Sequence, residues 1–179
     1  MSDNQGKIKK VSGENFWLEH RDRQVRKIIF DPNAPAGAAV AGQFNLWQDF
    51  AIEPKKGWSK QRRLMTHIHQ LICRRDKTKF RYLMRWLAWA VQNPDKTPET
   101  VIVLKSSLQG TGKSTLTNVM RAIFGSHAHV IADKERLLGR FNANLETACF
   151  ICAEEMIWAG DRGTADALKS LITGDSFTL

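Results

Sequence analysis

The 179-residue sequence has little cysteine and no long hydrophobic run, and each absence excludes a class of protein. No stretch approaches the roughly 18 apolar residues of a membrane span. The first ten residues, MSDNQGKIKK, lack the apolar centre of a signal peptide. The three cysteines, Cys73, Cys149 and Cys152, provide no disulfide framework. These absences predict a protein of the cytoplasm, with no membrane segment.

The sequence also lacks a cluster of metal ligands. Cys149 and Cys152 have C-x-x-C spacing, but they fall in an apolar, strand-like run where residues three apart face opposite sides. Ordinary burial therefore explains them better than zinc or redox chemistry. His67 and His69 would lie about 200° apart on a helix, too far round to share an ion. We expect no structural metal.

Positive charge is present in excess, with a net charge of +9, and it is unevenly distributed. Residues 1–100 hold 19 Lys and Arg against 10 Asp and Glu, whereas residues 101–179 hold eight of each. Basic and aromatic residues are interleaved in Lys77–Tyr82 and in Arg85-Trp86, which suits a polyanion such as nucleic acid. A solvated basic face that keeps the protein soluble explains the charge equally well, so both interpretations stay open.

The stretch Ser107-Leu108-Gln109-Gly110-Thr111-Gly112-Lys113-Ser114 is typical of a phosphate-binding loop. It follows the apolar run Val101–Leu104, which we predict to be a strand, and it precedes a predicted helix, Lys113–Phe124, that Gly125 ends. Glycines in such a loop let backbone N–H groups close on phosphate oxygens, and the helix offers its positive N-terminus to the same anion. A chance glycine-rich turn is the alternative, which the flanking strand and helix disfavour.

Two side chains complete the predicted nucleotide site. Lys113 would reach the β- and γ-phosphates of ATP, and the Ser114 hydroxyl would take one position on Mg²⁺. The first glycine of the usual pattern is replaced by Ser107, a small residue that can begin the turn. The predicted nucleotide-binding set is Ser107, Gly110, Thr111, Gly112, Lys113, Ser114 and Thr115.

The remaining predictions divide the chain into a basic arm and connector (1–43), a helical subdomain (44–97) and a nucleotide-binding core (98–179). The connector Asp31–Gly42 is rich in proline and glycine. An extended, aromatic-rich piece (44–54) should dock on the helices that follow it.

Two helices are predicted in the helical subdomain. The first should start at Ser59 as N-cap and run to about Cys73, and the second should run from Thr78 to Gln92, where Asn93-Pro94 ends it. The apolar face of the first helix consists of Leu64, Ile68, Leu71 and Ile72.

Beyond the phosphate loop we predict a short strand, His129–Ile131, and a helix that Asp133 caps. The fully apolar run Ala148–Ala153 suits a parallel strand buried on both faces. A last helix, Ala165–Thr173, should end at Gly174.

Glu154 and Glu155 follow the predicted buried strand, where ATP hydrolysis would need carboxylates. Successive strand residues point in opposite directions, so one carboxylate can face the metal while its neighbour reaches the γ-phosphate. We assign Glu154 to Mg²⁺ and Glu155 to activation of the attacking water, with Lys113 as the third catalytic residue. An acidic loop after a core strand is the alternative interpretation.

These residues resemble a known family. The segments LKSSLQGTGKSTL, GRFNANLETACFICAEEMIWAGD and ALKSLITGDSFTL are similar, in that order, to the superfamily 3 helicase module of phage and prophage primase-helicases, a branch of the AAA+ ATPases. Upstream, FNLWQDFAIEP and WLAWAVQNPDKTPETVIVL resemble the segment that precedes this ATPase core. The resemblance covers roughly residues 44–179.

The resemblance implies an α/β P-loop NTPase fold of the AAA+ type with a parallel sheet. It makes Ser107–Ser114 the Walker A loop and Ile151–Glu155 the Walker B segment, although the first Walker B acid is Glu154 where aspartate is more usual. Lys169–Leu179 would open the motif leading to a hairpin that contacts single-stranded DNA in a hexameric ring. The sensor asparagine, the rest of the hairpin and the arginine finger have no counterpart, so we expect a fragment of a longer protein.

Three functions are compatible with these residues. The first is an ATP-dependent DNA helicase or translocase module of a phage or prophage replication protein, working in the bacterial host cytoplasm. The second is a small-molecule P-loop kinase, which the few basic residues after Lys113 disfavour because such enzymes need lid arginines. The third is a non-catalytic nucleic-acid-binding fragment.

Overall fold

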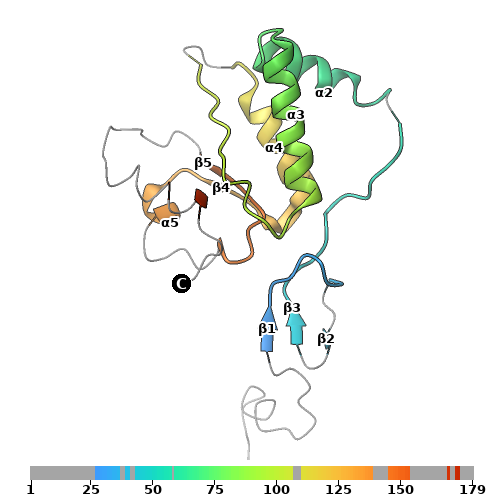
Figure 1. Ribbon diagram of the computed structural model, residues 1–179, viewed down its shortest axis with the longest axis vertical. Helices are drawn as coiled ribbons and strands as arrows, with labels where there is room; N and C mark the ends of the chain where they lie inside the picture. The colour runs from blue at the N-terminus through green and yellow to red at the C-terminus, as the bar shows by residue number, and fades with distance from the viewer. Residues whose placement is uncertain are drawn as a thin grey trace, which may run out of the picture.

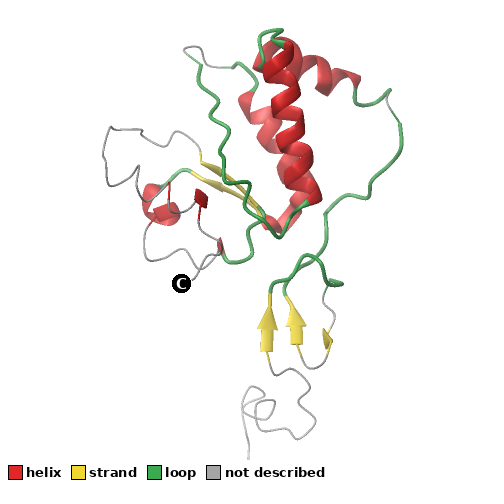
Figure 2. Cartoon of the chain, viewed as in Figure 1, coloured by secondary structure: helices red, strands yellow, loops and turns green. Residues whose placement is uncertain are grey.

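The computed structural model describes residues 27–36, 39–40, 43–57, 59–106, 110–138, 145–153, 169 and 172–173. They form helices and two small sheets, so the chain has an α/β fold (Figures 1 and 2). No described helix is long and apolar enough to cross a membrane. The strands are β1 (Lys27–Ile29), β2 (Ala39–Val40) and β3 (Gln43–Asn45) in one sheet, and β4 (Ala128–Ile131) and β5 (Phe150–Ala153) in the other.

Helix α3 (Lys77–Gln92) confirms the second predicted helix. Asp76 caps its N-terminus, because the carboxylate accepts hydrogen bonds from the backbone N–H groups of Thr78 at 2.9 Å and Lys79 at 3.1 Å. The bond from the Lys79 backbone is the largest cause that lowers the pKa of the Asp76 carboxyl group. Asn93 ends the helix, as predicted.

Helix α4 (Lys113–Phe124) also matches its prediction, with Gly125 as its C-terminal stop. Gly125 has a φ of 57°, a left-handed conformation that favours glycine. A Cβ atom there would lie 2.7 Å from the Cβ atom of Ala51, so close approach of the chain also requires glycine.

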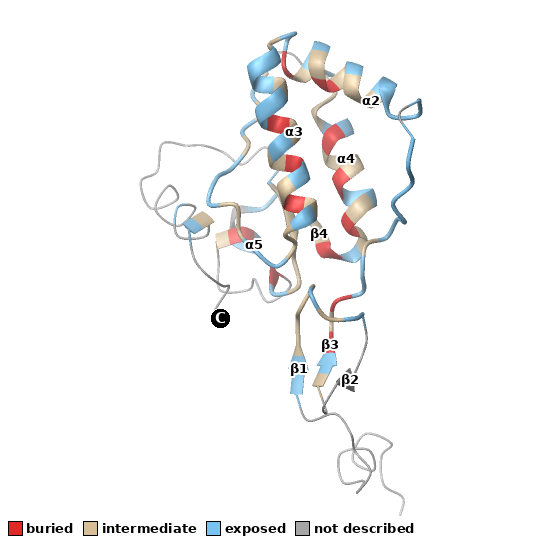
Figure 3. Cartoon of the chain, turned by 45° about the vertical axis from the view of Figure 1, so that its right-hand side comes forward, coloured by how far each residue is buried: buried red, intermediate tan, exposed pale blue. Residues whose placement is uncertain are grey.

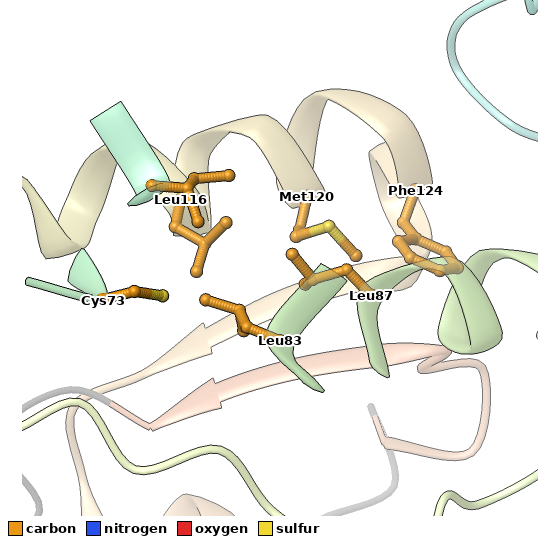
Figure 4. Close-up of a cluster of buried hydrophobic side chains, with 7 residues drawn as sticks. Cys73, Leu83, Leu87, Leu116, Met120 and Phe124 are labelled. Carbon is orange, nitrogen blue, oxygen red and sulfur yellow. The ribbon is translucent and has the colours of Figure 1, made fainter. Parts of the chain in front are cut away.

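The main hydrophobic core lies where α3 packs against α4 (Figure 3). Buried residues recur at intervals of four and three on α3 and of four on α4, so each set forms one row along its helix. Figure 4 shows Leu83 and Leu87 of α3 opposite Leu116 and Met120 of α4. The buried members are Ile68, Cys73, Leu83, Leu87, Leu116, Met120 and Phe124.

Strands β4 and β5 pair in parallel, which confirms both predicted strands. Side chains of β5 alternate: Phe150 packs on the α4 side, whereas Ile151 packs against a second core formed by Ile131, Leu137 and Leu145. That core lies under α5 (Lys134–Leu138), whose first turn Asp133 caps, accepting from the Glu135 N–H at 3.0 Å. The sheet therefore has α4 on one face and α5 on the other.

The prediction that β5 is fully buried on both faces is wrong for the described residues. Three of its side chains are half-buried and Ala153 is exposed. In the described part of the chain β5 has one neighbouring strand, β4, so one of its edges lacks a second strand to cover it. Of the predicted last helix, residues 169, 172 and 173 are described and are helical.

The predicted strand Val101–Leu104 is also wrong, since residues 101–106 run as an irregular extended segment. Burial alternates as it would in a strand: Ile102 and Leu104 pack on the main core, while Val101 and Val103 are 59% and 75% exposed. No ladder joins the segment to β4 or β5. The apolar pattern gave the correct inward face, but a strand also requires backbone pairing, which side-chain pattern does not specify.

The first predicted helix is divided into α2 (Arg62–His67) and a π-helical turn, η1 (Ile68–Ile72). Ser59 is not its N-cap, because Gln61 occupies that position without a side-chain hydrogen bond. In η1 the N–H of Cys73 bonds to the carbonyl of Ile68, five residues back, at 2.8 Å. This wider turn places Leu71 outside, 58% exposed, although α-helical spacing predicted it on the apolar face.

The small sheet is mixed: β3 lies between β1, which is parallel to it, and β2, which is antiparallel. The predicted connector therefore contributes a strand. The aromatic residues after β3 dock as predicted in the case of Phe50, which packs against the main core of α3 and α4. Trp47 stacks on His127 with ring centroids 4.6 Å apart, and Phe50 contacts Phe124 at 5.4 Å, both at the C-terminal end of α4.

Phe124 has no exposed surface, and its replacement should therefore be costly. We expect Phe124→Ala to lower the free energy of unfolding by about 3–5 kcal/mol, because a large cavity would remain between α3, α4 and β5. Ile52→Ala, at a half-exposed site, should cost less than about 1 kcal/mol. Urea denaturation followed by circular dichroism measures both, and equal costs would contradict the assigned core.

His129 on β4 has a buried Nε2 atom with no hydrogen-bond partner among the described residues. Desolvation, followed by repulsion from His127, lowers the pKa of His129. The native state therefore binds this proton less well than the unfolded state, so stability should fall as the pH drops below the ordinary histidine value of about 6.5. We expect His129→Leu to flatten the decline between about pH 7 and 5. An unchanged decline in denaturation experiments would refute this assignment.

Candidate nucleotide-binding site

The described part of the predicted phosphate loop, residues 110–112, has a backbone that requires glycine. Gly110 and Gly112 have φ values of 72° and 76°, both left-handed. Gly110 has open space where a Cβ atom would be, so conformation alone constrains it. At Gly112 a Cβ atom would also collide with the ring of His67. Ser107 lies outside the described residues, as do Leu108 and Gln109.

The loop leads directly into α4, with Gly112 as the N-cap and Lys113 as the first helical residue. The first N–H groups of an α-helix have no partner within it and give that end a partial positive charge. No acidic residue occupies the first turn, and the Lys113 ammonium group adds a full charge. The arrangement is suited to binding an anion.

Polar side chains surround the N-terminus of α4. Lys113 folds back so that its Nζ atom lies 3.5 Å from the Thr111 hydroxyl, to which it donates. Ser114 and Thr115 are exposed on the first turn, and the Thr115 N–H bonds to the Gly112 carbonyl at 3.2 Å. The Ser114 hydroxyl therefore remains accessible to a ligand or to a hydrated ion.

His67 is a residue of this site that sequence reasoning did not identify. Its Nε2 atom lies 3.1 Å from the Gly112 carbonyl oxygen. Because a carbonyl can only accept, the His67 Nε2–H must be the donor. The bond joins α2 to the phosphate loop across 45 residues of chain. No local pattern could have revealed it, since the sequence shows only two histidines on a predicted helix.

The N-terminal end of α4 and the carboxyl ends of β4 and β5 lie at the same edge of the sheet. In Figure 4 both strand arrows point in the direction that leads from Phe124 to Leu116 along α4. The hydroxyl of Thr117, four residues into the helix, contacts the Cys152 thiol at 3.3 Å. Cys152 comes two residues before Glu154, and Asp133 follows β4 at this edge. Glu154 and Glu155 themselves lie outside the described residues.

The cysteines of this region have no metal partners in the described part of the chain. No group of three or more His, Cys, Asp or Glu residues is gathered there closely enough to hold an ion. Burial, with a smaller effect of Asp95, raises the pKa of Cys149 to about 12, so this thiol stays protonated. Cys149 and Cys152 make different contacts, the first in the main core and the second with Thr117.

The close contact of His67 with Gly112 can be tested without a ligand. Gly110→Ala should cost about 1–2 kcal/mol of stability through backbone strain alone. Gly112→Ala should cost more, because its methyl group also collides with the His67 ring. In a His67→Ala background the two costs should become equal. Chemical denaturation of the variants measures this, and a Gly112→Ala cost that His67→Ala leaves unchanged would argue against the contact.

Comparison with known protein families gives a match to part of the chain. A family described as "Family of unknown function (DUF5906)" matches residues 104–179. The matched range contains the glycines of the loop, α4, both strands of the parallel sheet and the acidic pair Glu154-Glu155. No curated protein and no solved structure matches the chain. The glycine loop and the acidic pair thus lie within the segment that matches a family of unknown function, whereas His67 lies outside it.

Proposed function

We propose that the chain is the ATP-hydrolysing part of a DNA helicase or translocase of a phage or prophage replication protein, with a P-loop NTPase core of the AAA+ type. One observation carries the proposal. The N-terminus of α4, which Gly112 caps, lies at the same sheet edge as the carboxyl ends of the parallel strands β4 and β5. The contact between Thr117 of α4 and Cys152 of β5 joins the helix to the strand at this edge. Ligands of open α/β sheets bind at that edge.

In the proposed site, Gly110 to Thr115 hold the phosphates of ATP through backbone N–H groups, together with Ser107, and Lys113 adds the neutralising charge. The hydroxyl of Ser114 and the carboxylate of Glu154 would hold Mg²⁺, which supplies further charge neutralisation at the phosphates. Magnesium needs only one or two protein ligands besides phosphates and water, so this small donor set suffices.

The alternation of side chains along β5 supports the division of roles between Glu154 and Glu155. Along β5, Phe150 and Cys152 face α4 while Ile151 faces the opposite side. Continued alternation predicts the α4 side, and therefore the phosphate side, for Glu154. Glu155 would then orient the attacking water as a general base.

The proposal extends to the assembly. Neighbouring subunits of a homo-oligomeric ring, a hexamer by resemblance, would complete each site, and ATP turnover would drive movement along single-stranded DNA in the host cytoplasm.

Two alternative functions would give different products from ATP. A small-molecule kinase would transfer the γ-phosphate to an acceptor, whereas a non-catalytic nucleic-acid-binding fragment would bind ATP without turnover.

ATP hydrolysis measured with and without single-stranded DNA tests the proposal. We expect DNA to stimulate turnover and Lys113→Ala to abolish ATP binding or turnover. Glu155→Gln should retain ATP binding but lose about 10²–10⁴-fold in rate, because it removes the general base.

Arg121→Ala on the same helix and Glu146→Gln before β5 are matched controls, since both side chains are exposed and lie outside the site. Unchanged hydrolysis in Lys113→Ala would refute the assignment. ATP binding without turnover, even with DNA present, would favour the non-catalytic fragment, and phosphate transfer to a small acceptor would favour the kinase.

A further inference from the structure

Most of the net positive charge of the chain is carried by one pair of helices, α2–η1–α3 (residues 62–92), which we name the basic helix pair (Figure 1). It holds eight Lys and Arg residues against a single acidic one, Asp76. The other 148 residues hold 19 Lys and Arg against 17 Asp and Glu, so they are close to neutral. The charge is therefore a local property of this element.

Within α3 the cations form a row. Lys77, Arg81 and Arg85 recur at intervals of four, which places them on one line along the helix. All three are exposed, whereas Leu83 and Leu87 face α4. Figure 3 shows this division of α3 into a buried and an exposed side. Like charges four residues apart destabilise a helix, so this row adds nothing to the stability of the fold.

None of the three cations has an acidic partner in the described part of the chain. The ion pair in this region joins Lys79 to Asp76 at 3.1 Å, so the one acidic residue of the basic helix pair is already occupied. It also caps α3. The row of Lys77, Arg81 and Arg85 thus presents uncompensated charge to solvent.

Two further arginines lie in the turn between the helices in a strained backbone conformation. Arg74 and Arg75 have φ values of 50° and 64°, in the left-handed region where glycine is the usual residue. Their side chains are exposed. Arginine is thus present twice where glycine would fit the backbone better, and folding gives no reason for it. Strained residues of this kind often mark functional positions.

An aromatic ring lies beside the cationic row. Tyr82 follows Arg81 on α3 and is 54% exposed, whereas the indole of Trp86 packs partly on the core. An exposed ring among arginines is the arrangement by which proteins stack unpaired bases while cations follow the phosphate backbone. A bilayer is a poor match, because the other exposed side chains of α3 are polar or small and offer no apolar face for insertion.

We propose that the basic helix pair binds a single strand of nucleic acid, with Arg74, Arg75, Lys77, Arg81 and Arg85 on the phosphates and Tyr82 stacked on a base. The proposal deepens the proposed function, on which it rests for the partner, by naming the surface that takes the strand. His67, the last residue of α2 in the same helix pair, donates a hydrogen bond to the Gly112 carbonyl of the phosphate loop. The surface is thus directly connected to the nucleotide site.

Fluorescence anisotropy of the full chain with a labelled oligothymidylate of about 16 nucleotides, without ATP, tests the proposal. The variant Lys77→Gln/Arg81→Gln/Arg85→Gln should bind about tenfold more weakly and reduce the slope of log K against log salt by about 2, because single strands lose about 0.7 per phosphate contact. The control Lys55→Gln/Lys56→Gln/Lys96→Gln removes equal charge from exposed positions elsewhere. An equal loss in the control would overturn the proposal.

The turn and the ring give independent tests. Arg74→Gly/Arg75→Gly should weaken binding while leaving the fold at least as stable, because glycine relieves the left-handed backbone. Unchanged binding in this variant would contradict the assignment. Tyr82→Ala should lose roughly fivefold in affinity for single strands while Tyr82→Phe retains it. Tighter binding of duplex, with no effect of Tyr82→Ala, would overturn the choice of single strands.

One comparison distinguishes DNA from RNA as the bound strand, and another distinguishes strand binding from ATP hydrolysis. Oligouridylate in place of oligothymidylate distinguishes RNA from DNA, and binding of either one supports the surface. Lys113→Ala should leave binding intact, because this measurement needs no ATP. Strand binding and ATP turnover are therefore tested separately. A chain that hydrolyses ATP but binds neither oligonucleotide would refute the strand-binding surface and leave the proposed ATPase function unaffected.

Discussion

The arrangement of the candidate site depends on how the C-terminal end of α4 is anchored. Phe124 has no exposed surface and stacks on Phe150 of β5, with ring centroids 5.9 Å apart, while Phe50 contacts its ring at 5.4 Å. Beside it, the N–H of Ala51 bonds to the Ile123 carbonyl at 2.9 Å. Apolar packing and this bond anchor the C-terminal end of α4, a helix about 18 Å long. The N-terminal end can therefore carry glycines and polar groups without loss of the anchor.

Two buried polar side chains, Asn45 in the small sheet and His127 after α4, have their hydrogen bonds satisfied. Asn45 accepts from the N–H groups of Asp31 and Trp47 and donates to the Asp31 carbonyl at 2.8 Å. His127 accepts from the Gln48 N–H at Nε2 and donates from Nδ1 to the Thr147 carbonyl. A buried polar group without such partners would be costly. Asn45 therefore holds the turn at Asp31 against β3, whereas His127 joins the chain after β3 to the segment before β5.

Local signals predicted the elements nearest the site, and long-range pairing decided what they missed. Asn93 and Gly125 end their helices as expected, because a cap acts within one turn of backbone. The segment Val101–Leu104 has the burial pattern of a strand but no hydrogen-bonded neighbour, and the π turn rotates Leu71 out of the predicted face. His67 meets Gly112 only after 45 residues of chain, so no spacing rule could find it.

The hydrogen bond from His67 to Gly112 also has a thermodynamic consequence. The carbonyl that accepts it belongs to the peptide that precedes α4, so a change of loop conformation alters the free energy of α2 as well. Such coupling is reciprocal: a ligand that shifts the loop and a ligand that shifts the basic helix pair must change each other's affinity by the same factor. A single imidazole contact thus links the phosphate loop to the basic helix pair, the two surfaces for which ligands are proposed.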